Sequence, residues 1–282
     1  MKPNVTTFIG CEATYEDSKM VIFGAPYDST TSFRPGTRFA STAIRNESFG
    51  IETYSPYQDK DLEDIAVFDA GDIELPFGNT AETLKMLEEQ VATIAGDGKL
   101  PIMIGGEHSI TAGPVKAMLE KYPDLHLIQF DAHTDLREDY LGVRESHASV
   151  IKRCWDMLGD GRIFQFGIRS GQREEFEWAK GHTHLQKFNF DGLAEVVEQL
   201  KDKPVYFTLD LDVLDPSEFP GTGTPEAGGV RFTELMAAIE KISQLNIVAA
   251  DMNELCPIYD QSGQSTALAC KLLREIMLYL YK

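Results

Sequence analysis

One pattern constrains the fold of this chain more than any other. Short apolar segments, rich in β-branched and aromatic residues, alternate along it with segments of helical periodicity. Each short segment is a nearly continuous apolar run, which is typical of strands buried on both faces. Strands that alternate with helices in this way form parallel sheets covered by helices. The predicted strands are Met20–Gly24, Ile65–Phe68, Pro101–Ile104, Leu125–Phe130, Arg162–Phe166, Leu185–Phe190, Val205–Leu209 and Ile247–Ala250.

Helical segments are predicted between these strands. The sequence Asn-Thr-Ala-Glu at 79–82 has the form of a capping box, and an apolar stripe follows it. The alternating units fit an open sheet or a closed barrel, and periodicity does not separate the two. Both architectures carry functional residues at the carboxyl ends of the strands. Further helices are expected after Ser109, Ser146, Asp191 and Phe232, and over Ala267–Tyr281.

The composition is that of a globular protein. Hydrophobic residues make up 43% and charged residues 25% of the chain, which excludes a disordered or fibrous protein. A length of 282 residues is enough to bury a substantial core. The sequence has no internal repeat and no linker-like tract. We therefore expect one domain spanning residues 1–282.

The charge balance limits the partners. The chain has 26 Lys and Arg against 45 Asp and Glu, a net charge of −19. Because such a surface repels phosphate groups, neither a nucleic acid nor a membrane is expected as a partner. A cationic small molecule would be attracted, although excess acid can equally serve solubility alone.

Cysteine usage and the N-terminal segment indicate the compartment. The four cysteines form no C-x-x-C pair and are expected to be reduced and mostly buried. The first residues lack the basic and apolar regions of a signal peptide, and no apolar run approaches the ~20 residues of a membrane span. We expect a cytoplasmic protein.

Histidine and aspartate follow three of the predicted strands. The three sequences are Gly-Gly-Glu-His-Ser at 105–109, Asp-Ala-His-Thr-Asp at 131–135 and Asp-Leu-Asp at 210–212. Residues i and i+2 of an extended chain point to the same side, so each sequence is expected to direct its side chains together if the chain stays extended. The predicted cluster contains His108, Asp131, His133, Asp135, Asp210 and Asp212.

The charge of this cluster predicts two metal ions. Four carboxylates packed together are costly without a counter-charge, and a metal ion removes that cost. Six ligands are too many for one tetrahedral ion but suit two ions with bridging carboxylates, typically ~3.5–4 Å apart. Oxygen-rich ligands with imidazole and no thiolate favour Mn²⁺, with Zn²⁺, Fe²⁺ and Co²⁺ left open. With a bridging hydroxide the site keeps a negative charge, which suits a cationic substrate.

These three sequences resemble the signatures of the ureohydrolases, the family of arginases, agmatinases and their relatives. The resemblance extends from Pro-Tyr-Asp at 26–28 and Arg-Pro-Gly at 34–36, through Gly-Thr-Gly-Thr-Pro-Glu at 221–226, to the last strand. It implies a three-layer α/β/α sandwich with a mostly parallel eight-stranded sheet, and so favours the open sheet over the barrel. It also implies two Mn²⁺ ions per subunit and a homo-oligomer, often a trimer or hexamer.

The resemblance also implies roles for single residues. One ion would be held by His108, Asp131, Asp135 and Asp210, and the other by Asp131, His133, Asp210 and Asp212. His147 matches the mobile catalytic histidine of the family, and Glu254 matches the carboxylate that binds the guanidinium group. Asp135 would relay a proton to the leaving amine, with His147 as a shuttle.

The substrate is inferred from departures within the family. Arginases have an Asn- and Ser/Thr-rich segment after the second signature, where this chain has residues 136–140, Leu-Arg-Glu-Asp-Tyr. They also have acidic residues directly after a Gly-Leu-Arg turn, whereas Gly-Ile-Arg at 167–169 is followed by Ser-Gly-Gln. Both departures argue against arginine, and residues 167–170 and 220–226 are closer to bacterial agmatinases.

The resulting hypothesis is hydrolysis of agmatine to putrescine and urea, a step of polyamine biosynthesis, by a metal-bridging hydroxide. Another guanidine hydrolase remains an alternative: guanidinobutyrase, arginase or formiminoglutamase. A catalytically silent homologue that binds a partner or ligand is a further alternative.

Other polar residues near strand ends have simpler explanations. An ordinary helix-start histidine is the alternative for His147, and a common strand-end acid is the alternative for Glu254. Turn or cap roles are expected for Asp28, Asp72 and Asp251, which lack histidine companions.

Overall fold

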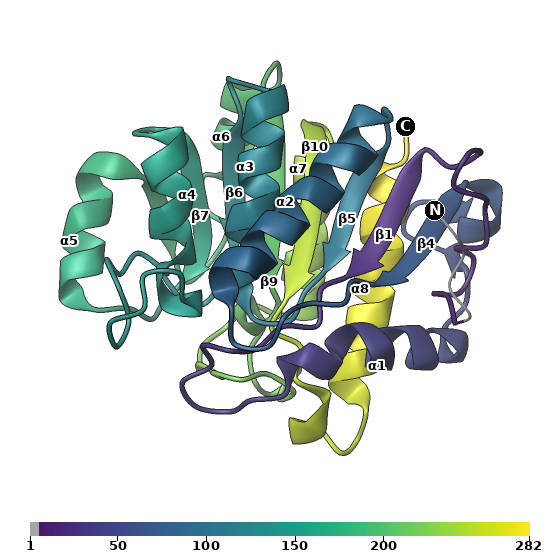
Figure 1. Ribbon diagram of the computed structural model, residues 1–282, viewed down its shortest axis with the longest axis horizontal. Helices are drawn as coiled ribbons and strands as arrows, with labels where there is room; N and C mark the ends of the chain where they lie inside the picture. Colours follow the sequence, from purple (N-terminus) through teal and green to yellow (C-terminus); the bar gives the residue numbers. More distant parts are fainter. Residues whose placement is uncertain (1–5) are drawn as a thin grey trace.

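The computed structural model describes residues 6–282, and within them eight strands form one parallel sheet (Figure 1). The strand order is β4-β1-β5-β10-β9-β6-β7-β8. This confirms the predicted open sheet. The strands are β1 Met20–Gly24, β4 Val67–Asp72, β5 Leu100–Ile104, β6 His126–Phe130, β7 Ile163–Ile168, β8 His184–Lys187, β9 Pro204–Asp210 and β10 Asn246–Asn253, with a separate hairpin of β2 Tyr54–Ser55 and β3 Lys60–Asp61.

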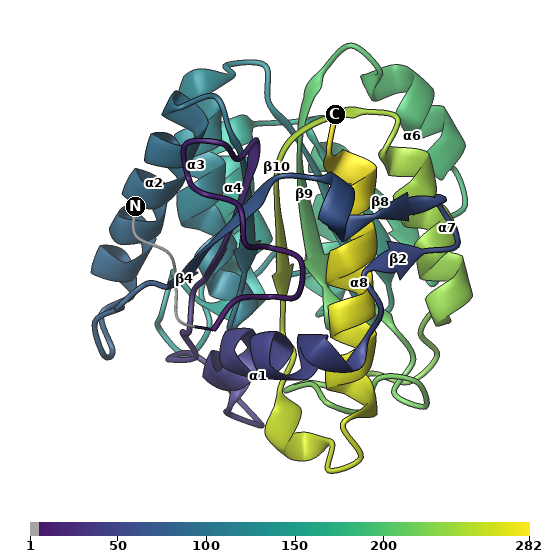
Figure 2. The same cartoon turned by 90° about the vertical axis from the view of Figure 1, so that its right-hand side faces the viewer.

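Helices cover both faces of the sheet and complete the predicted three-layer α/β/α sandwich. Figure 2 shows α2, α3 and α4 on one side of the strands and α6, α7 and α8 on the other. Helix α1 packs against α8 on the second side. The helices are α1 Ala40–Glu47, α2 Thr80–Gly96, α3 Ala112–Lys121, α4 Val150–Leu158, α5 Arg173–His182, α6 Leu193–Leu200, α7 Phe232–Ile242 and α8 Gln264–Leu280.

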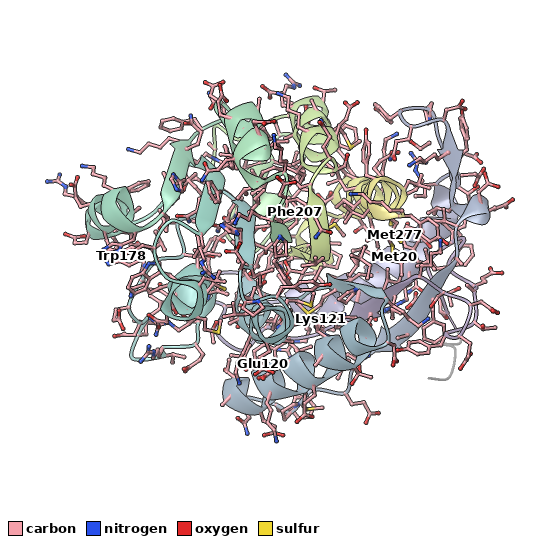
Figure 3. All side chains as sticks on the ribbon, turned by 90° about the horizontal axis from the view of Figure 1, so that it is seen from above. Met20, Glu120, Lys121, Trp178, Phe207 and Met277 are labelled. Atoms are coloured by element: carbon pink, nitrogen blue, oxygen red, sulfur yellow. The ribbon has the colours of Figure 1, made fainter. Side chains whose placement is uncertain are left out.

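Alternate side chains of each strand enter two separate cores, which explains the continuous apolar runs. In β1, Val21 and Phe23 join the core beneath α2 and α3, whereas Met20 and Ile22 join the core beneath α7 and α8. Figure 3 shows Met20, Phe207 and Met277 within the crowded interior. A strand with both faces buried in this way has no solvent-exposed position for a polar residue.

The observed elements differ from the sequence predictions mainly at their ends. Strand β4 is shifted toward Asp72, β8 ends at Lys187, and β10 continues to Asn253. Helices α1 and α5 were not predicted, because their sequences are rich in polar residues. The predicted cap at residues 79–82 is present, since the Asn79 side chain accepts a hydrogen bond from the Glu82 amide.

The functional residues are expected at one edge of this sheet, where β5, β10, β9 and β6 lie side by side. The chain passes from β5 directly to β6, and β9 and β10 later fill the space between them. Such a change in connection order is where open α/β sheets bind ligands.

Two expectations concern the ends and the surroundings of the chain. Residues 1–5, on which part of the prediction of no signal peptide depends, lie outside the described residues. Among residues 6–282, no helix has the length and apolar character that crossing a bilayer requires.

Candidate metal centre

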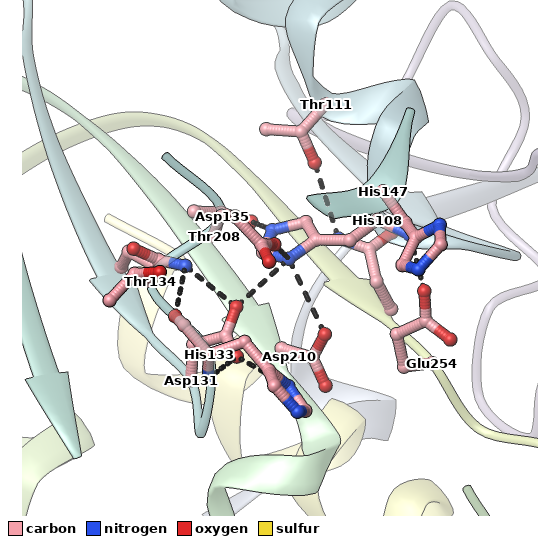
Figure 4. A network of polar contacts seen from close by, with 12 residues as sticks. His108, Thr111, Asp131, His133, Thr134, Asp135, His147, Thr208, Asp210 and Glu254 are labelled. Carbon is pink, nitrogen blue, oxygen red and sulfur yellow. Dashed lines mark hydrogen bonds and ion pairs between the residues drawn. The ribbon is translucent and has the colours of Figure 1, made fainter. Parts of the chain in front are cut away.

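The six predicted ligands lie together at the carboxyl ends of three central strands, and Figure 4 labels all of them except Asp212. His108 begins the short 3₁₀ helix that follows β5, and Asp210 is the last residue of β9. The segment 131–135 follows β6, and Asp212 lies in a 3₁₀ turn after β9. All but His133 are buried.

The side chains form two groups that share Asp131. His108 Nδ1 lies 3.0 Å from Asp131 Oδ2, 3.2 Å from an oxygen of Asp135 and 3.3 Å from an oxygen of Asp210. His133 Nδ1 lies 3.0 Å from Asp212 Oδ2 and 3.6 Å from Asp131 Oδ1. Each of the groups His108–Asp131–Asp135 and Asp131–His133–Asp212 has its candidate donor atoms within 4.8 Å of one another, and either could hold a metal ion.

The sequence predicted that an extended chain would bring these side chains together. In the structure, the chain does not stay extended through these residues. Asp135 has a left-handed backbone with φ of 53°, so the chain turns before it. Asp212 lies in a 3₁₀ turn, and its backbone amide donates a hydrogen bond to Asp210 Oδ1 at 2.8 Å. Tight turns rather than i, i+2 alternation bring these carboxylates together, because the strands end at Phe130 and Asp210.

Unsatisfied polar atoms show that the cluster fits metal ions. Within residues 6–282, His108 Nδ1 and Asp212 Oδ2 are buried and lie 3.0 Å from Asp131 Oδ2 and His133 Nδ1, respectively, yet neither atom makes a hydrogen bond. Buried polar atoms normally have partners, and an ion between these groups would supply them. Two imidazoles with four carboxylates, and no thiolate, are donors that suit Mn²⁺.

A second chain of contacts fixes the ring of His108. Its Nε2 lies 2.8 Å from Thr208 Oγ1, and this hydroxyl donates to Asp251 Oδ1 at 2.6 Å. Because the Thr208 proton is used on Asp251, Nε2 of His108 must carry a hydrogen, so that Nδ1 is the nitrogen whose lone pair would bind a metal ion when the ring is neutral. Metal-binding histidines typically have an outer partner of this kind.

The role expected for Asp251 was therefore wrong. It is not a turn or cap residue, because β10 extends through it and buries it between neighbouring strands. Its other oxygen accepts a hydrogen bond from Tyr206 at 2.6 Å. The sequence signal was available: Thr208, Asp210, Asp251 and Asn253 are polar residues at the ends of otherwise apolar strands.

The pKa shifts reflect the crowding of charge. Burial alone would lower the pKa of His108, but contacts with three carboxylates raise it well above its usual value. Burial, and next the charge of Asp131, raises the pKa of Asp135 to about 7. Burial and the carboxylates of Asp212 and Asp131 raise the pKa of Asp210. The cluster holds more negative charge than its own residues neutralise, and divalent cations would relieve this.

Glu254 lies beside the cluster, directly after β10. Its Oε1 accepts a hydrogen bond from the His108 amide at 2.6 Å, and its own amide donates to Gly106 O at 2.9 Å. Its backbone φ of 67° is left-handed, as is that of Asp135. Left-handed non-glycine residues are costly and concentrate at functional sites.

A pocket of about 190 Å³ opens over the cluster and is lined by residues of all three signature sequences and of neighbouring loops. His147 and Glu254 both line it, and Figure 4 shows them together at one side of the cluster. The loop residues Ser32, Arg137 and Tyr140 also line it, although sequence reasoning assigned them no role. Arg137 and Tyr140 belong to the segment 136–140 that sets this chain apart from arginases, whereas nothing in the local sequence marks Ser32.

Comparisons with known proteins identify the family of this chain. Residues 18–279 match the Arginase family. The agmatinase of Bacillus subtilis (strain 168) is 47% identical over 279 residues, covering 98% of this chain and 96% of that protein. The agmatinase of Bacillus anthracis is 49% identical over 275 residues, covering 96% and 95%.

Two solved structures extend the comparison. The agmatine ureohydrolase of Thermoplasma volcanium has a TM-score of 0.89 at 36% identity, covering 98% of this chain and 94% of that one. The proclavaminate amidino hydrolase of Streptomyces clavuligerus has a TM-score of 0.90 at 31% identity, covering 99% and 97%. On sequence and on fold, this chain belongs to the Arginase family.

Proposed function

We propose that this protein is an agmatinase, a binuclear manganese hydrolase that converts agmatine and water to putrescine and urea. The observation that carries the proposal is the buried carboxylate of Glu254 beside a cluster of six metal-type ligands, four of which line the same pocket as Glu254. A planar guanidinium cation presents paired N–H groups that match a carboxylate. A guanidine substrate would use both features, the carboxylate to bind its guanidinium group and the metal-type ligands to hold the ions that activate water.

The metal sites follow the two groups of side chains. His108, Asp131, Asp135 and Asp210 would hold one Mn²⁺. The second would be held by His133 and Asp212, with Asp131 and Asp210 shared. Two such ions would lower the pKa of a water molecule and so supply a hydroxide nucleophile at neutral pH.

The remaining residues orient the substrate and move protons. Glu254 would hold the guanidinium group, and the arriving cation would favour its ionised form although burial raises the pKa of this carboxyl. Asp135 would pass a proton toward the leaving amine, and His147 lines the same pocket and would shuttle protons.

Agmatine is preferred as the substrate because of the relatives and the net charge of the chain. Relatives at 47% and 49% identity over nearly the whole chain are agmatinases. The net charge of −19 also favours a substrate with two positive charges.

One observation favours 4-guanidinobutyrate as a second candidate. Arg137 lines the pocket, and its guanidinium lies 4.5 Å from the centre of the Tyr140 ring. A cation at this place would attract a carboxylate tail. However, Arg137 Nε lies 3.6 Å from Glu175 Oε2, which partly offsets its charge.

The test is to load the purified protein with Mn²⁺ and measure urea from agmatine, 4-guanidinobutyrate and arginine side by side. We expect kcat/KM to be highest for agmatine. A higher value for 4-guanidinobutyrate or arginine would overturn the choice of substrate. No urea from any guanidine would contradict the enzyme itself and favour a silent homologue.

We also propose a cytoplasmic homo-oligomer, a trimer or hexamer. All four cysteines are buried and unpaired within residues 6–282, which suits a reducing compartment. Phe33, Phe39 and Ile258 are exposed apolar side chains suited to a contact between subunits. Sedimentation velocity of the purified protein would give the subunit number, and a monomer would contradict this proposal.

A further inference from the structure

The imidazole of His147 contacts a hydroxyl group at each of its nitrogens. Nδ1 lies 3.2 Å from Thr30 Oγ1, and Nε2 lies 3.3 Å from Ser32 Oγ. The Tyr140 ring packs edge-on against the imidazole, with 5.6 Å between centroids. The ring is therefore held in place, and the position of its proton depends on these two hydroxyls.

The hydroxyl of Thr30 has one proton, and the structure uses it elsewhere. Thr30 Oγ1 donates to Glu107 Oε1 at 2.7 Å and accepts from the His147 amide at 3.1 Å. A hydroxyl has one donor and two acceptor sites. With its proton on Glu107, Thr30 can meet Nδ1 of His147 only as an acceptor, so Nδ1 must carry the hydrogen.

Glu107 is surrounded by donors, which keeps it an acceptor. The carboxylate is fully buried and also accepts from the Thr30 amide at 2.7 Å, from Thr31 Oγ1 at 3.3 Å and from Ser109 Oγ. Since every neighbouring group donates, a proton on Glu107 would displace one of these contacts.

We propose that Glu107 and Thr30 fix His147 as the Nδ1–H tautomer, so that the lone pair of Nε2 faces the pocket and the Ser32 hydroxyl, which can donate to it. Both are positioning residues that act through His147. The chain His147–Thr30–Glu107 has the same construction as His108–Thr208–Asp251, a histidine held by a threonine whose proton is given to a buried carboxylate. The two chains hold opposite ring nitrogens, which suits a proton shuttle in one case and a metal ligand in the other.

The consequence for catalysis rests on the proposed function. When the guanidine C–N bond breaks, the leaving amine nitrogen must gain a proton. Nε2 of His147 can accept a proton released by the attacking water and deliver it to that nitrogen, while Nδ1–H stays on Thr30. The opposite tautomer would present an N–H group to the pocket and could not accept this proton.

The tautomer is tested directly by long-range ¹H–¹⁵N NMR of histidine-labelled, metal-free protein near pH 7. The His147 signals are assigned by their loss in His147→Gln. We expect a protonated Nδ1 and a bare Nε2 in the natural chain, and a mixture of tautomers in Thr30→Val. A bare Nδ1 in the natural chain would overturn the proposal, as would an unchanged tautomer in Thr30→Val.

Steady-state kinetics on the Mn²⁺-loaded protein distinguish a loss of His147 positioning from a general loss of folded structure. We expect Thr30→Val to lower kcat at least about tenfold with KM within twofold and bound metal unchanged, and Thr30→Ser to restore most of kcat. Thr42→Val, at an exposed threonine of α1, is the matched control and should keep the natural kcat. Equal kcat in Thr30→Val and the natural chain would contradict the role of Thr30.

The NMR result does not depend on activity, so the two proposals can fail separately. A natural chain that releases no urea but has the expected tautomer would contradict the proposed function alone. An active natural chain with the opposite tautomer would contradict the inference alone.

Discussion

Asp210 lies 3.3 Å from His108 and accepts the amide of Asp212, and in the proposed metal sites both ions share it. A change there should therefore affect both ions. Replacing it by Asn keeps the size of the side chain but removes its charge. We expect Asp210→Asn to lower bound Mn²⁺ below two per chain and kcat by more than about 100-fold. Metal content by elemental analysis and urea release measure the two effects together. Asp202→Asn, at an exposed carboxylate, is the control, and full metal content in Asp210→Asn would contradict the ligand assignment.

His147 should contribute to the acid sensitivity of the metal-free protein. Burial, and then the charges of His133 and Arg137, lowers its pKa to about 4, against ~6.5 for an ordinary histidine. Between these values the unfolded chain binds a proton that the folded chain does not, so stability is lost as pH falls from 6.5 toward 4. We expect His147→Asn to make the fall in unfolding free energy over this window shallower, by about 1–3 kcal/mol in total. Urea denaturation at pH 7, 6 and 5 measures this, and parallel curves for variant and natural chain would contradict it.

The sequence predicted the residues that carry charge more completely than those that hold them in place. His108, Asp131 and Asp210 stand in short motifs that a reader can find along the chain. Thr30 contacts His147 across 117 positions, and Thr208 contacts His108 across 100. No local pattern marks a threonine for such a contact, because it depends on which strands become neighbours.

The junction of β5 and the following segment leaves no room for a side chain at Gly106. A Cβ there would lie 1.9 Å from the backbone oxygen of Tyr27, and Gly106 O accepts the amide of Glu254. We expect Gly106→Ala to destabilise the fold by about 3 kcal/mol, because the backbone must move to make room for the added Cβ. We also expect a lower kcat, because this backbone movement displaces Glu254. Gly181→Ala in α5 meets nothing within 4 Å and should instead stabilise the fold, by about 0.5–1 kcal/mol. Chemical denaturation compares the two, and equal effects would contradict this account.

Strand β4 and helix α1 show why some elements were predicted poorly. The sequence of β4 contains Asp69 and Asp72, which end the apolar run that the prediction relied on. In the structure Arg45 of α1 is buried and pairs with both carboxylates, at 2.9 Å for Asp69. A buried carboxylate is tolerated when its partner is in place, but the partner comes from a different element. The sequence of β4 can therefore be identified as a strand only when the Arg45 of α1 that pairs with its carboxylates is known.

At the scale of the whole molecule, the strand order lay beyond the reach of periodicity. Continuous apolar runs predicted a parallel sheet, yet they gave no reason why β10 should lie between β5 and β9. The family resemblance supplied the open sheet. The order matters because it brings His108, Asp131 and Asp210, which are far apart in sequence, to one edge.

Binding of metal should therefore stabilise the whole fold, since the ligands join three central strands. An ion that binds only the folded chain adds about 2.7 kcal/mol of stability when its free concentration is 100 times its Kd. For a chain of this size this corresponds to a rise in Tm of roughly 5–10 °C. We expect Mn²⁺ to raise Tm by this amount, EDTA to reverse the rise, and Asp210→Asn to lose most of it. Asp202→Asn should keep the full rise. Scanning calorimetry measures all four, and a Tm independent of Mn²⁺ in the natural chain would leave the six clustered ligands without the ions that their charge requires.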